Sequence, residues 1–202
     1  MKRITLQDIQ ANPDCIAARL SNRSGLSVIF RPLMSSDAIL LGRYFLNLSE
    51  ETRRRYGPHP FDQATADHFC ATIDYAHTIR MIATISSGAQ EQAIAYFIFL
   101  LGVLKNDHER YASLPLPLAP RSDCTVAPSL ADAYQNQGLG SPLMQHLFTV
   151  ARWLGFKRMI LMGGVQATNE RGVHYYEKNG FRKVNTFEKP TGIFNYDMIR
   201  DL

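Results

Sequence analysis

The stretch YQNQGLGSPL, residues 134–143, decides how the rest of the chain is read. Gly138 and Gly140 allow a backbone to approach a bulky anion closely. Ser141 is expected to cap the helix that follows and Pro142 to be its first residue, because the missing N–H of proline costs nothing there. The free N–H groups of a helix's first turn favour negative charge. The stretch is therefore either an anion-binding loop or a plain strand-to-helix turn.

Two familiar phosphate-binding patterns do not fit this stretch. A Walker loop needs a lysine directly after its last glycine, and none is present. A dinucleotide fingerprint needs a third glycine at the position that Leu143 occupies. What remains is Q-x-x-G-x-G, from Gln135 to Gly140, between a predicted strand and a predicted helix.

The composition is that of an ordinary soluble globular protein. The chain has 202 residues, of which 46% are hydrophobic and 20% charged, and one compact domain is the simplest expectation. The longest apolar run, Ala93 to Leu104, is shorter than the roughly 20 residues of a membrane span. The start MKRITLQDIQ lacks the apolar stretch of a secretory signal. We therefore expect a cytoplasmic protein with no membrane partner.

Charge and metal-ligand patterns exclude further classes. The formal net charge of +4 is small and spread along the chain, so we expect no nucleic-acid partner. The three cysteines are widely separated, and the six histidines form no ligand pair. Neither a disulfide framework nor a metal site is predicted.

Hydrophobic periodicity divides the chain into short strands and helices. Strands are expected at Leu26–Arg31, Ile79–Ile85, Ala93–Val103, Cys124–Ala131, Arg158–Val165, Phe181–Glu188 and Ile193–Ile199. Helices are expected after Ser35–Asp37, from Ser49 to before Gly57, and at about Asp62–Ala76, Ser141–Leu154 and Glu170–Lys178. The strands around SSGAQE, residues 86–91, are expected to form an antiparallel hairpin.

Three segments interrupt this pattern. Residues 1–25 are interpreted as an N-terminal appendage to a single domain, residues 26–202. Residues 105–123, KNDHERYASLPLPLAPRSD, are too long for an ordinary connection and are interpreted as a functional flap or a disordered insertion. Pro128 removes a donor from its strand, so a bulge or a sheet edge is expected there.

A second motif follows about 30 residues after the glycine loop. It is NERGVHYYEKNGF, Asn169 to Phe181, and the two motifs at this separation resemble the GNAT superfamily of acetyl-CoA-dependent N-acetyltransferases. The resemblance covers about residues 26–200. The family's [QR]-x-x-G-x-[GA] loop is matched in full, whereas its N-x-x-A-x-x-[LF]-Y-x-x-x-G-F signature departs at Gly172 and Tyr175.

The resemblance implies both a fold and a co-substrate. The fold is of the α+β class (α/β three-layer type), with a mixed, mostly antiparallel sheet of six to seven strands whose fourth and fifth strands splay apart between flanking helices. Acetyl-CoA would donate its acetyl group directly to a primary amine of a small molecule or peptide, without a metal. The positions implied to bind coenzyme A are Leu130, Ala131, Asp132, Gln135, Asn136, Gln137, Gly138, Leu139, Gly140, Ser141, Asn169 and Tyr176, with residues 163–166 opposite.

The resemblance assigns Tyr176 as the general acid that protonates the departing thiolate. A tyrosine is suited to this role because its pKa near 10 keeps it protonated at neutral pH. Taken without the resemblance, Tyr175 and Tyr176 are aromatic core residues and Asn169 is a helix cap.

The general base is open at this stage. Similar proteins carry a glutamate ten or eleven residues before the glutamine of the loop, and Thr125 and Cys124 occupy those positions here. Asp123 and Asp132 are the nearest candidates, although each also fits a strand-end carboxylate. Deprotonation through ordered water, or of an amine that is already partly neutral, is the alternative.

The acceptor side is equally open. The resemblance implies that the acceptor enters near the loop between the first two helices, which makes Arg54, Tyr56 and His59 candidates. The arginine cluster 53–55 fits either an acidic acceptor or a surface helix C-terminus. A homodimer is one open arrangement, and a non-catalytic acyl-CoA-binding sensor or regulatory domain is the alternative function.

Overall fold

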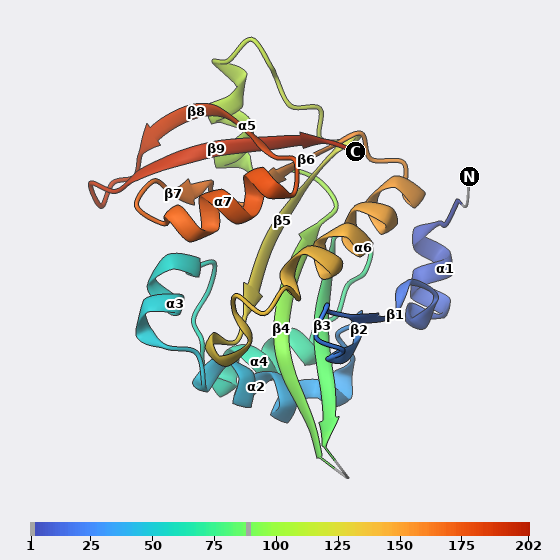
Figure 1. Ribbon diagram of the computed structural model, residues 1–202. Helices are drawn as coiled ribbons and strands as arrows, with labels where there is room; N and C mark the ends of the chain where they lie inside the picture. The colour runs from blue at the N-terminus through green and yellow to red at the C-terminus, as the bar shows by residue number, and fades with distance from the viewer. Residues whose placement is uncertain (1–2, 88–89) are drawn as a thin grey trace.

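A computed structural model describes residues 3–87 and 90–202 (Figure 1). Its strands form one nine-stranded sheet in the order β1-β2-β3-β4-β5-β6-β9-β7, with β8 paired to β9. The pairs are antiparallel except for β5 with β6. The predicted mixed, mostly antiparallel sheet is therefore confirmed, with two more strands than the upper expectation of seven.

The two additional strands have separate origins. One is β1 in the N-terminal segment, and the other arises because the predicted strand at residues 158–165 divides into β6 and β7. The strands are β1 Ala18–Ser21, β2 Ser27–Pro32, β3 Thr78–Ser87, β4 Gln90–Leu100, β5 Asp123–Leu130, β6 Arg158–Leu161, β7 Val165–Gln166, β8 Arg182–Glu188 and β9 Phe194–Asp201. The hairpin of β3 and β4 is confirmed, while its tip, residues 88–89, lies outside the described residues.

Helices cover both faces of the sheet (Figure 1). The α-helices are α1 Leu6–Ala11, α2 Ala38–Leu46, α3 Glu50–Tyr56, α4 Gln63–Ala71, α5 Lys105–Ala112, α6 Gly140–Trp153 and α7 Glu170–Lys178. Helices α1 and α6 bury Ile9, Leu147 and Phe148 in one core cluster, and α2 and α4 bury Phe45 and Cys70 in another. The sheet is thus the middle of three layers.

The sheet divides at Pro128. Parallel pairing of β5 with β6 runs from Asp123 opposite Arg158 to Val126 opposite Leu161 and then ends. One further bond joins the Met162 N–H to the Val126 carbonyl oxygen at 3.0 Å. The next bond of a parallel ladder would need an N–H at position 128, which proline lacks. The strands therefore separate at this position, which is an interior sheet edge of the kind expected there.

The N-terminal segment, which the sequence analysis interprets as an appendage, contributes a strand to the sheet and side chains to the core. Strand β1 pairs with β2, and Ile9 and Ile16 are fully buried. The His146 imidazole of α6 forms a 2.8 Å hydrogen bond with the Ile16 carbonyl. The N-terminal segment is therefore packed onto the domain, and its Ile4, Ile9 and Ile16 join the core cluster that includes α6.

The 105–123 segment is neither a flap over the cleft nor disordered. Its first part forms α5, which packs Tyr111 against Ile160 and Ile199 of the sheet. The remainder leads into β5, where Asp123 accepts a hydrogen bond from the Ala119 N–H at 2.6 Å. The charged first part of the segment is thus a helix that buries Asp107 and Tyr111.

No helix among the described residues combines the length and apolar character of a membrane span.

Candidate functional site

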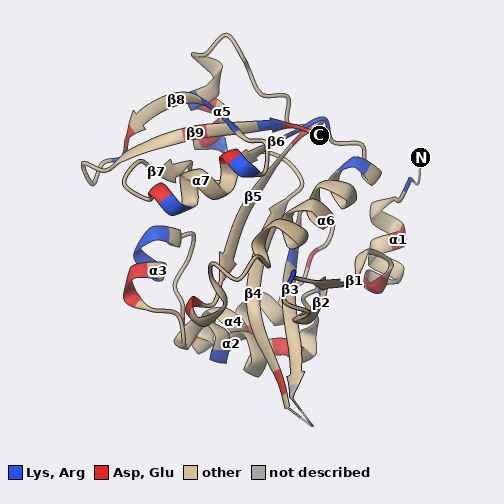
Figure 2. Cartoon of the chain, in the orientation of Figure 1, with Lys and Arg blue, Asp and Glu red and all other residues tan. Residues whose placement is uncertain are grey.

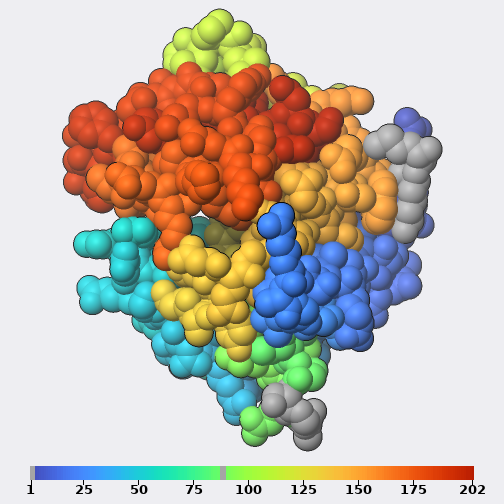
Figure 3. All heavy atoms as spheres, viewed as in Figure 1, coloured from blue at the N-terminus to red at the C-terminus, as the bar shows by residue number. Residues whose placement is uncertain are grey.

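A cleft of about 410 Å³ opens where β5 and β6 separate. Its walls are the ends of β5 and β6, the start of β7, and the residues around α3, α6 and α7. Figure 3 shows the hollow between α3, the loop of residues 135–140 and α7. The two sequence motifs therefore meet at one cavity, although about 30 residues separate them.

The glycine loop presents backbone groups to this cleft. Asn136 and Gly138 have left-handed backbones, with φ of 60° and 77°, and both line the cleft. No side chain caps α6, whose N-cap residue is Leu139 and not the predicted Ser141. Pro142 is accordingly the third helical residue, not the first. The first-turn N–H groups of α6 are left without a side-chain cap, as an anion-binding helix start requires.

Gln135 closes the loop onto the neighbouring elements. Its side-chain amide donates to the Leu130 carbonyl oxygen at 3.0 Å and to the Thr52 hydroxyl at 3.3 Å. The side chain thus ties the loop to the end of β5 and to α3. Of the other predicted positions, Leu139, Gly140 and Ser141 line the cleft, whereas Ala131, Asp132 and Gln137 are not among the lining residues.

The two tyrosines of α7 have different surroundings. The Tyr175 hydroxyl donates to the Gly140 carbonyl oxygen at 2.9 Å, which fixes α7 to the start of α6. Tyr176 lines the cleft, and burial raises the pKa of its hydroxyl well above 10. Of the pair, Tyr176 has the hydroxyl that is not engaged with α6.

Asn169 has the capping geometry. Its Oδ1 accepts from the Gly172 N–H at 3.1 Å at the start of α7, and also from the Arg55 guanidinium at 3.1 Å. A second bond, from the Gln166 amide to the Arg54 carbonyl oxygen at 3.0 Å, joins the same two regions. The C-terminal end of α3 is therefore tied to the start of α7 across the cleft.

The Asp132 carboxylate accepts three hydrogen bonds from the residues at the start of α3. It accepts from the Ser49 N–H at 2.9 Å, the Ser49 hydroxyl at 2.7 Å and the Thr52 hydroxyl at 2.6 Å. Burial acts to raise the pKa of Asp132, but these hydrogen bonds outweigh it and the pKa is lowered. The geometry is that of a carboxylate holding the N-terminus of α3.

Asp123 is buried in an ion pair at the closed end of the β5–β6 ladder. Its Oδ1 accepts from the Arg158 Nε at 2.8 Å, and its side chain is fully buried. Asp123 is not among the residues that line the cleft. Both base candidates are thus engaged with partners of their own.

The three acceptor-side candidates separate in the structure. Tyr56 lines the cleft and donates to the Ala127 carbonyl oxygen at 2.9 Å. His59 instead packs its ring against Phe45 and Phe61, with centroids 5.1 and 5.0 Å away, and burial lowers its pKa. Arg54 is exposed and does not line the cleft.

The charged side chains that line the cleft are all basic: Arg55, Arg171 and Lys178. Figure 2 shows charged residues on α3 and α7, the two helices beside the cleft. On α7, Arg171 and Lys178 share one helix face, while Gly172 and Tyr176 share another. Among the described residues, no group of three or more acidic, histidine or cysteine side chains has the arrangement of a metal site.

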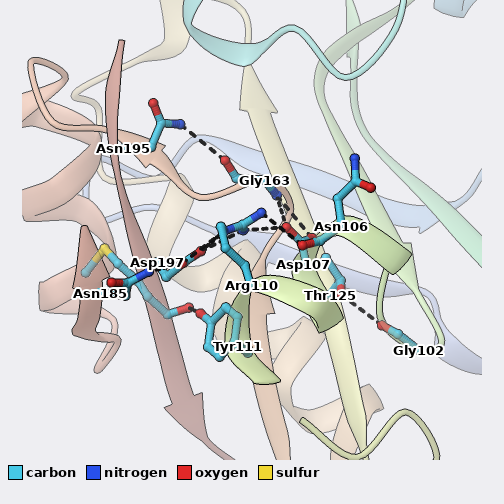
Figure 4. Close-up of polar contacts among 11 residues, drawn as sticks. Gly102, Asn106, Asp107, Arg110, Tyr111, Thr125, Gly163, Asn185, Asn195 and Asp197 are labelled. Carbon is cyan, nitrogen blue, oxygen red and sulfur yellow. Dashed lines mark hydrogen bonds and ion pairs between the residues drawn. The ribbon is translucent and has the colours of Figure 1, made fainter. Parts of the chain in front are cut away.

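A buried polar cluster behind the cleft had no sequence signal (Figure 4). Arg110 of α5 donates to Asp107 at 2.6 Å and to Asp197 of β9 at 2.7 Å. The Asp107 carboxylate also accepts from the Gly163 N–H at 3.2 Å, and Gly163 adjoins the cleft-lining Gly164. Asp107 and Arg110 share α5, but Gly163 and Asp197 lie 56 and 87 positions away, and only the fold brings them together.

Comparison with solved structures identifies the fold. The GNAT domain of PAT from S. lividans aligns with a TM-score of 0.74 at 22% identity, covering 94% of this chain and 99% of that one. The aminoglycoside acetyltransferase AAC(6')-Ib, in complex with ribostamycin and coenzyme A, aligns with a TM-score of 0.65 at 19% identity, covering 86% and 93%. The chain therefore shares its fold with the GNAT domain of PAT and with AAC(6')-Ib.

Sequence comparison finds one family model and one relative. The model of the Acetyltransferase (GNAT) family matches residues 129–181, which include both motifs. A Pseudomonas aeruginosa protein, acetyltransferase PA5475, is 27% identical over 143 residues, which are 67% of this chain and 65% of that protein. The alignment thus spans less than two thirds of the relative's length. In its two motifs and in its fold, the chain is similar to the GNAT superfamily.

Proposed function

We propose that this protein is an N-acetyltransferase that moves the acetyl group of acetyl-CoA directly to a primary amine of a small molecule or peptide. The observation that carries the proposal is the uncapped start of α6, which faces the same cleft as Tyr176. A cytoplasmic location belongs to this proposal, because acetyl-CoA is an intracellular metabolite.

The cleft suits the two chemically different halves of coenzyme A. Backbone N–H groups of the glycine loop and α6 would bind the pyrophosphate, assisted by the basic residues at the cleft. The pantetheine arm would lie between the separated β5 and β6. The related AAC(6')-Ib has been solved with coenzyme A and with aminoglycosides, which supports a co-substrate of this kind.

The transfer itself needs few protein groups. The amine nitrogen forms a bond to the thioester carbonyl carbon, and the carbon–sulfur bond then breaks. Tyr176 gives its proton to the departing thiolate and regains one from solvent. Because Asp123 and Asp132 are engaged in other contacts, the amine's proton leaves through water or is lost before binding.

The first test is calorimetric titration with acetyl-CoA, with 3'-dephospho-CoA and adenosine diphosphate as controls. We expect saturable, roughly micromolar binding that depends on the pantetheine arm. A panel of primary amines then follows, with release of free thiol as the readout. The absence of acetyl-CoA binding would overturn the proposal.

A non-catalytic acyl-CoA sensor is the second candidate function. The observation that favours it is the engagement of both candidate base carboxylates in structural contacts. Tight acetyl-CoA binding without thiol release for any amine, over pH 6 to 10, would support the sensor over the enzyme.

A further inference from the structure

Two peptide units of the cleft wall are each held from outside the cleft by a buried side chain. In a planar trans peptide, the C=O and the following N–H point in opposite directions. A side chain that fixes one of these groups therefore aims the other. The two units join Gln137 to Gly138 and Met162 to Gly163. In the first unit the carbonyl group is held from outside the cleft, and in the second unit the N–H group is held.

Asn22 holds the first unit. Its side-chain amide donates to the Gln137 carbonyl oxygen at 2.8 Å, across 115 positions of sequence. The residue is only 7% exposed, and its Oδ1 accepts from the Leu26 N–H at 2.9 Å within the β1–β2 turn. Gly138 lines the cleft and Gln137 does not. With the Gln137 carbonyl drawn toward Asn22, the Gly138 N–H points toward the cleft.

Asp107 holds the second unit from the other side of the sheet. Its carboxylate accepts from the Gly163 N–H at 3.2 Å, and the residue is 1% exposed (Figure 4). Met162 lines the cleft and Gly163 does not. With the Gly163 N–H drawn toward Asp107, the Met162 carbonyl points toward the cleft. Pro128 has no N–H with which to meet this carbonyl.

The two units thus present opposite groups. Gly138 lies in the glycine loop and offers a donor, which suits a phosphate oxygen. Met162 lies where β5 and β6 separate and offers an acceptor, which suits an amide N–H. The Asp107 carboxylate also polarises its peptide unit, because hydrogen bonds in a chain strengthen one another.

We propose that Asn22 and Asp107 are positioning residues for the two halves of the co-substrate, Asn22 for the phosphate half and Asp107 for the pantetheine arm. This inference rests on the proposed function, since it assumes that acetyl-CoA occupies the cleft. Both residues lie outside residues 129–181, the region that the family model matches.

The test compares two ligands in calorimetric titrations: acetyl-CoA, and its nucleotide half, 3'-phosphoadenosine 5'-diphosphate. The ratio of the two Kd values reports the contribution of the arm. For Asn22→Ala, we expect both Kd values to rise about tenfold and the ratio to stay constant. For Asp107→Leu, we expect the Kd of acetyl-CoA to rise about tenfold with that of the nucleotide unchanged.

Matched controls remove nearby contacts without touching either peptide unit. Ser24→Ala deletes the 2.9 Å bond to the Asn22 Oδ1 in the same turn. Asp197→Asn alters the Arg110 ion pair but not the Gly163 contact. Both are expected to lower the melting temperature without changing either Kd. If Asp107→Leu does not fold, Asp107→Asn keeps one acceptor oxygen, and a smaller rise of the acetyl-CoA Kd alone is expected.

Three outcomes would overturn the inference. One is an Asn22→Ala variant that binds both ligands as the unchanged protein does. Another is an Asp107 variant that weakens the nucleotide as much as acetyl-CoA, which would indicate general loosening of the fold. The third is an equal effect of Asp197→Asn and Asp107→Leu on the ratio. A failure of the proposed function differs from all three, because the unchanged protein would then not bind acetyl-CoA.

Discussion

At the residue scale, Tyr175 and Tyr176 show how neighbours in sequence acquire different roles. Both are aromatic and both hydroxyls have raised pKa values because of burial. Only Tyr175 has its hydroxyl bonded to Gly140 of α6. Both side chains line the cleft, but the helix turns by about 100° between consecutive residues, and only the Tyr175 hydroxyl reaches α6.

Replacement of each tyrosine by phenylalanine should therefore give different kinetics. Tyr176→Phe removes the proposed acid and should lower kcat by about 100-fold with little change in the KM for acetyl-CoA. Tyr175→Phe should raise that KM and lower the melting temperature, with kcat largely kept. Steady-state thiol release measures both. Full activity of Tyr176→Phe would mean that solvent protonates the thiolate.

The pH dependence of Tyr176 has a definite sign. Burial disfavours the phenolate and raises the pKa, so the hydroxyl remains protonated through pH 10. We expect kcat, measured with a saturating amine, to show no decline between pH 7 and 10 from ionisation of this group. A decline near pH 8 that Tyr176→Phe abolishes would contradict the raised pKa of this hydroxyl.

Gly138 and Gly155 form a matched pair for testing the glycine loop. Both have a left-handed backbone, with φ of 77° and 90°, and a Cβ atom added at either would meet no atom within 4 Å beyond the adjacent residues. Each change to valine should cost about 1–2 kcal/mol of backbone strain. Only Gly138→Val should also raise the Kd for acetyl-CoA, by at least tenfold, in calorimetric titration. Equal Kd values for the two variants would remove the loop assignment.

At the scale of elements, α3 depends on a carboxylate from outside itself. Asp132 binds Ser49 and Thr52 at the start of this helix, where the helix dipole favours negative charge. The lowered pKa means that its contribution is present above the unfolded value near 3.8 and is lost as pH falls through the folded value.

Asp132→Asn should therefore lower the melting temperature at pH 7 and have less effect as the pH falls below 4. The difference between variant and unchanged protein, measured by thermal unfolding from pH 7 to 3, should shrink toward the acid end. Ser24→Ala, at a site with no carboxylate, provides the control. A difference that stays constant with pH would show that the charge of Asp132 does not matter.

Local patterns predicted most elements but not their ends. The caps of α3, Ser49 and Gly57, and the whole of α7 follow from short-range rules and are confirmed. The start of α6 differs, since the helix begins one residue before Ser141 and lacks a side-chain cap. Under the proposed function, the free N–H groups of this helix start bind the co-substrate, so the local capping rule fails at a position that the proposal assigns to binding.

At the scale of the whole molecule, the sequence predicted the two motifs at the cleft but not the buried side-chain contacts behind them. The two motifs indicated the glycine loop and α7 because each is contiguous. The contacts of Asn22 and Asp107 connect segments 115 and 56 positions apart, and no periodicity or motif carries such pairs. The buried Asp123–Arg158 pair was likewise invisible, because each partner alone looks like a surface charge.

The basic cleft should make co-substrate binding sensitive to salt. Arg55, Arg171 and Lys178 line the cleft, and coenzyme A carries several phosphate charges. Raising the salt from about 0.02 to 0.5 M should weaken acetyl-CoA binding several-fold, because screening shortens the range of these attractions. Lys178→Met should reduce this dependence, whereas Arg43→Met on the exposed side of α2 should not. Calorimetry at a series of salt concentrations measures the slope.

The gap that begins at Pro128 should make ligand binding visible in the hydrogen exchange of the backbone amides beside it. Between its two halves, the described sheet is joined by only the short β5–β6 ladder, from Asp123 to Val126 on β5. Beyond this ladder, the amide hydrogens that border the gap exchange with solvent unless a ligand covers them. An acyl-CoA arm in the gap would act as a temporary strand. Its arrival would slow deuterium uptake at the end of β5, and its departure would restore it.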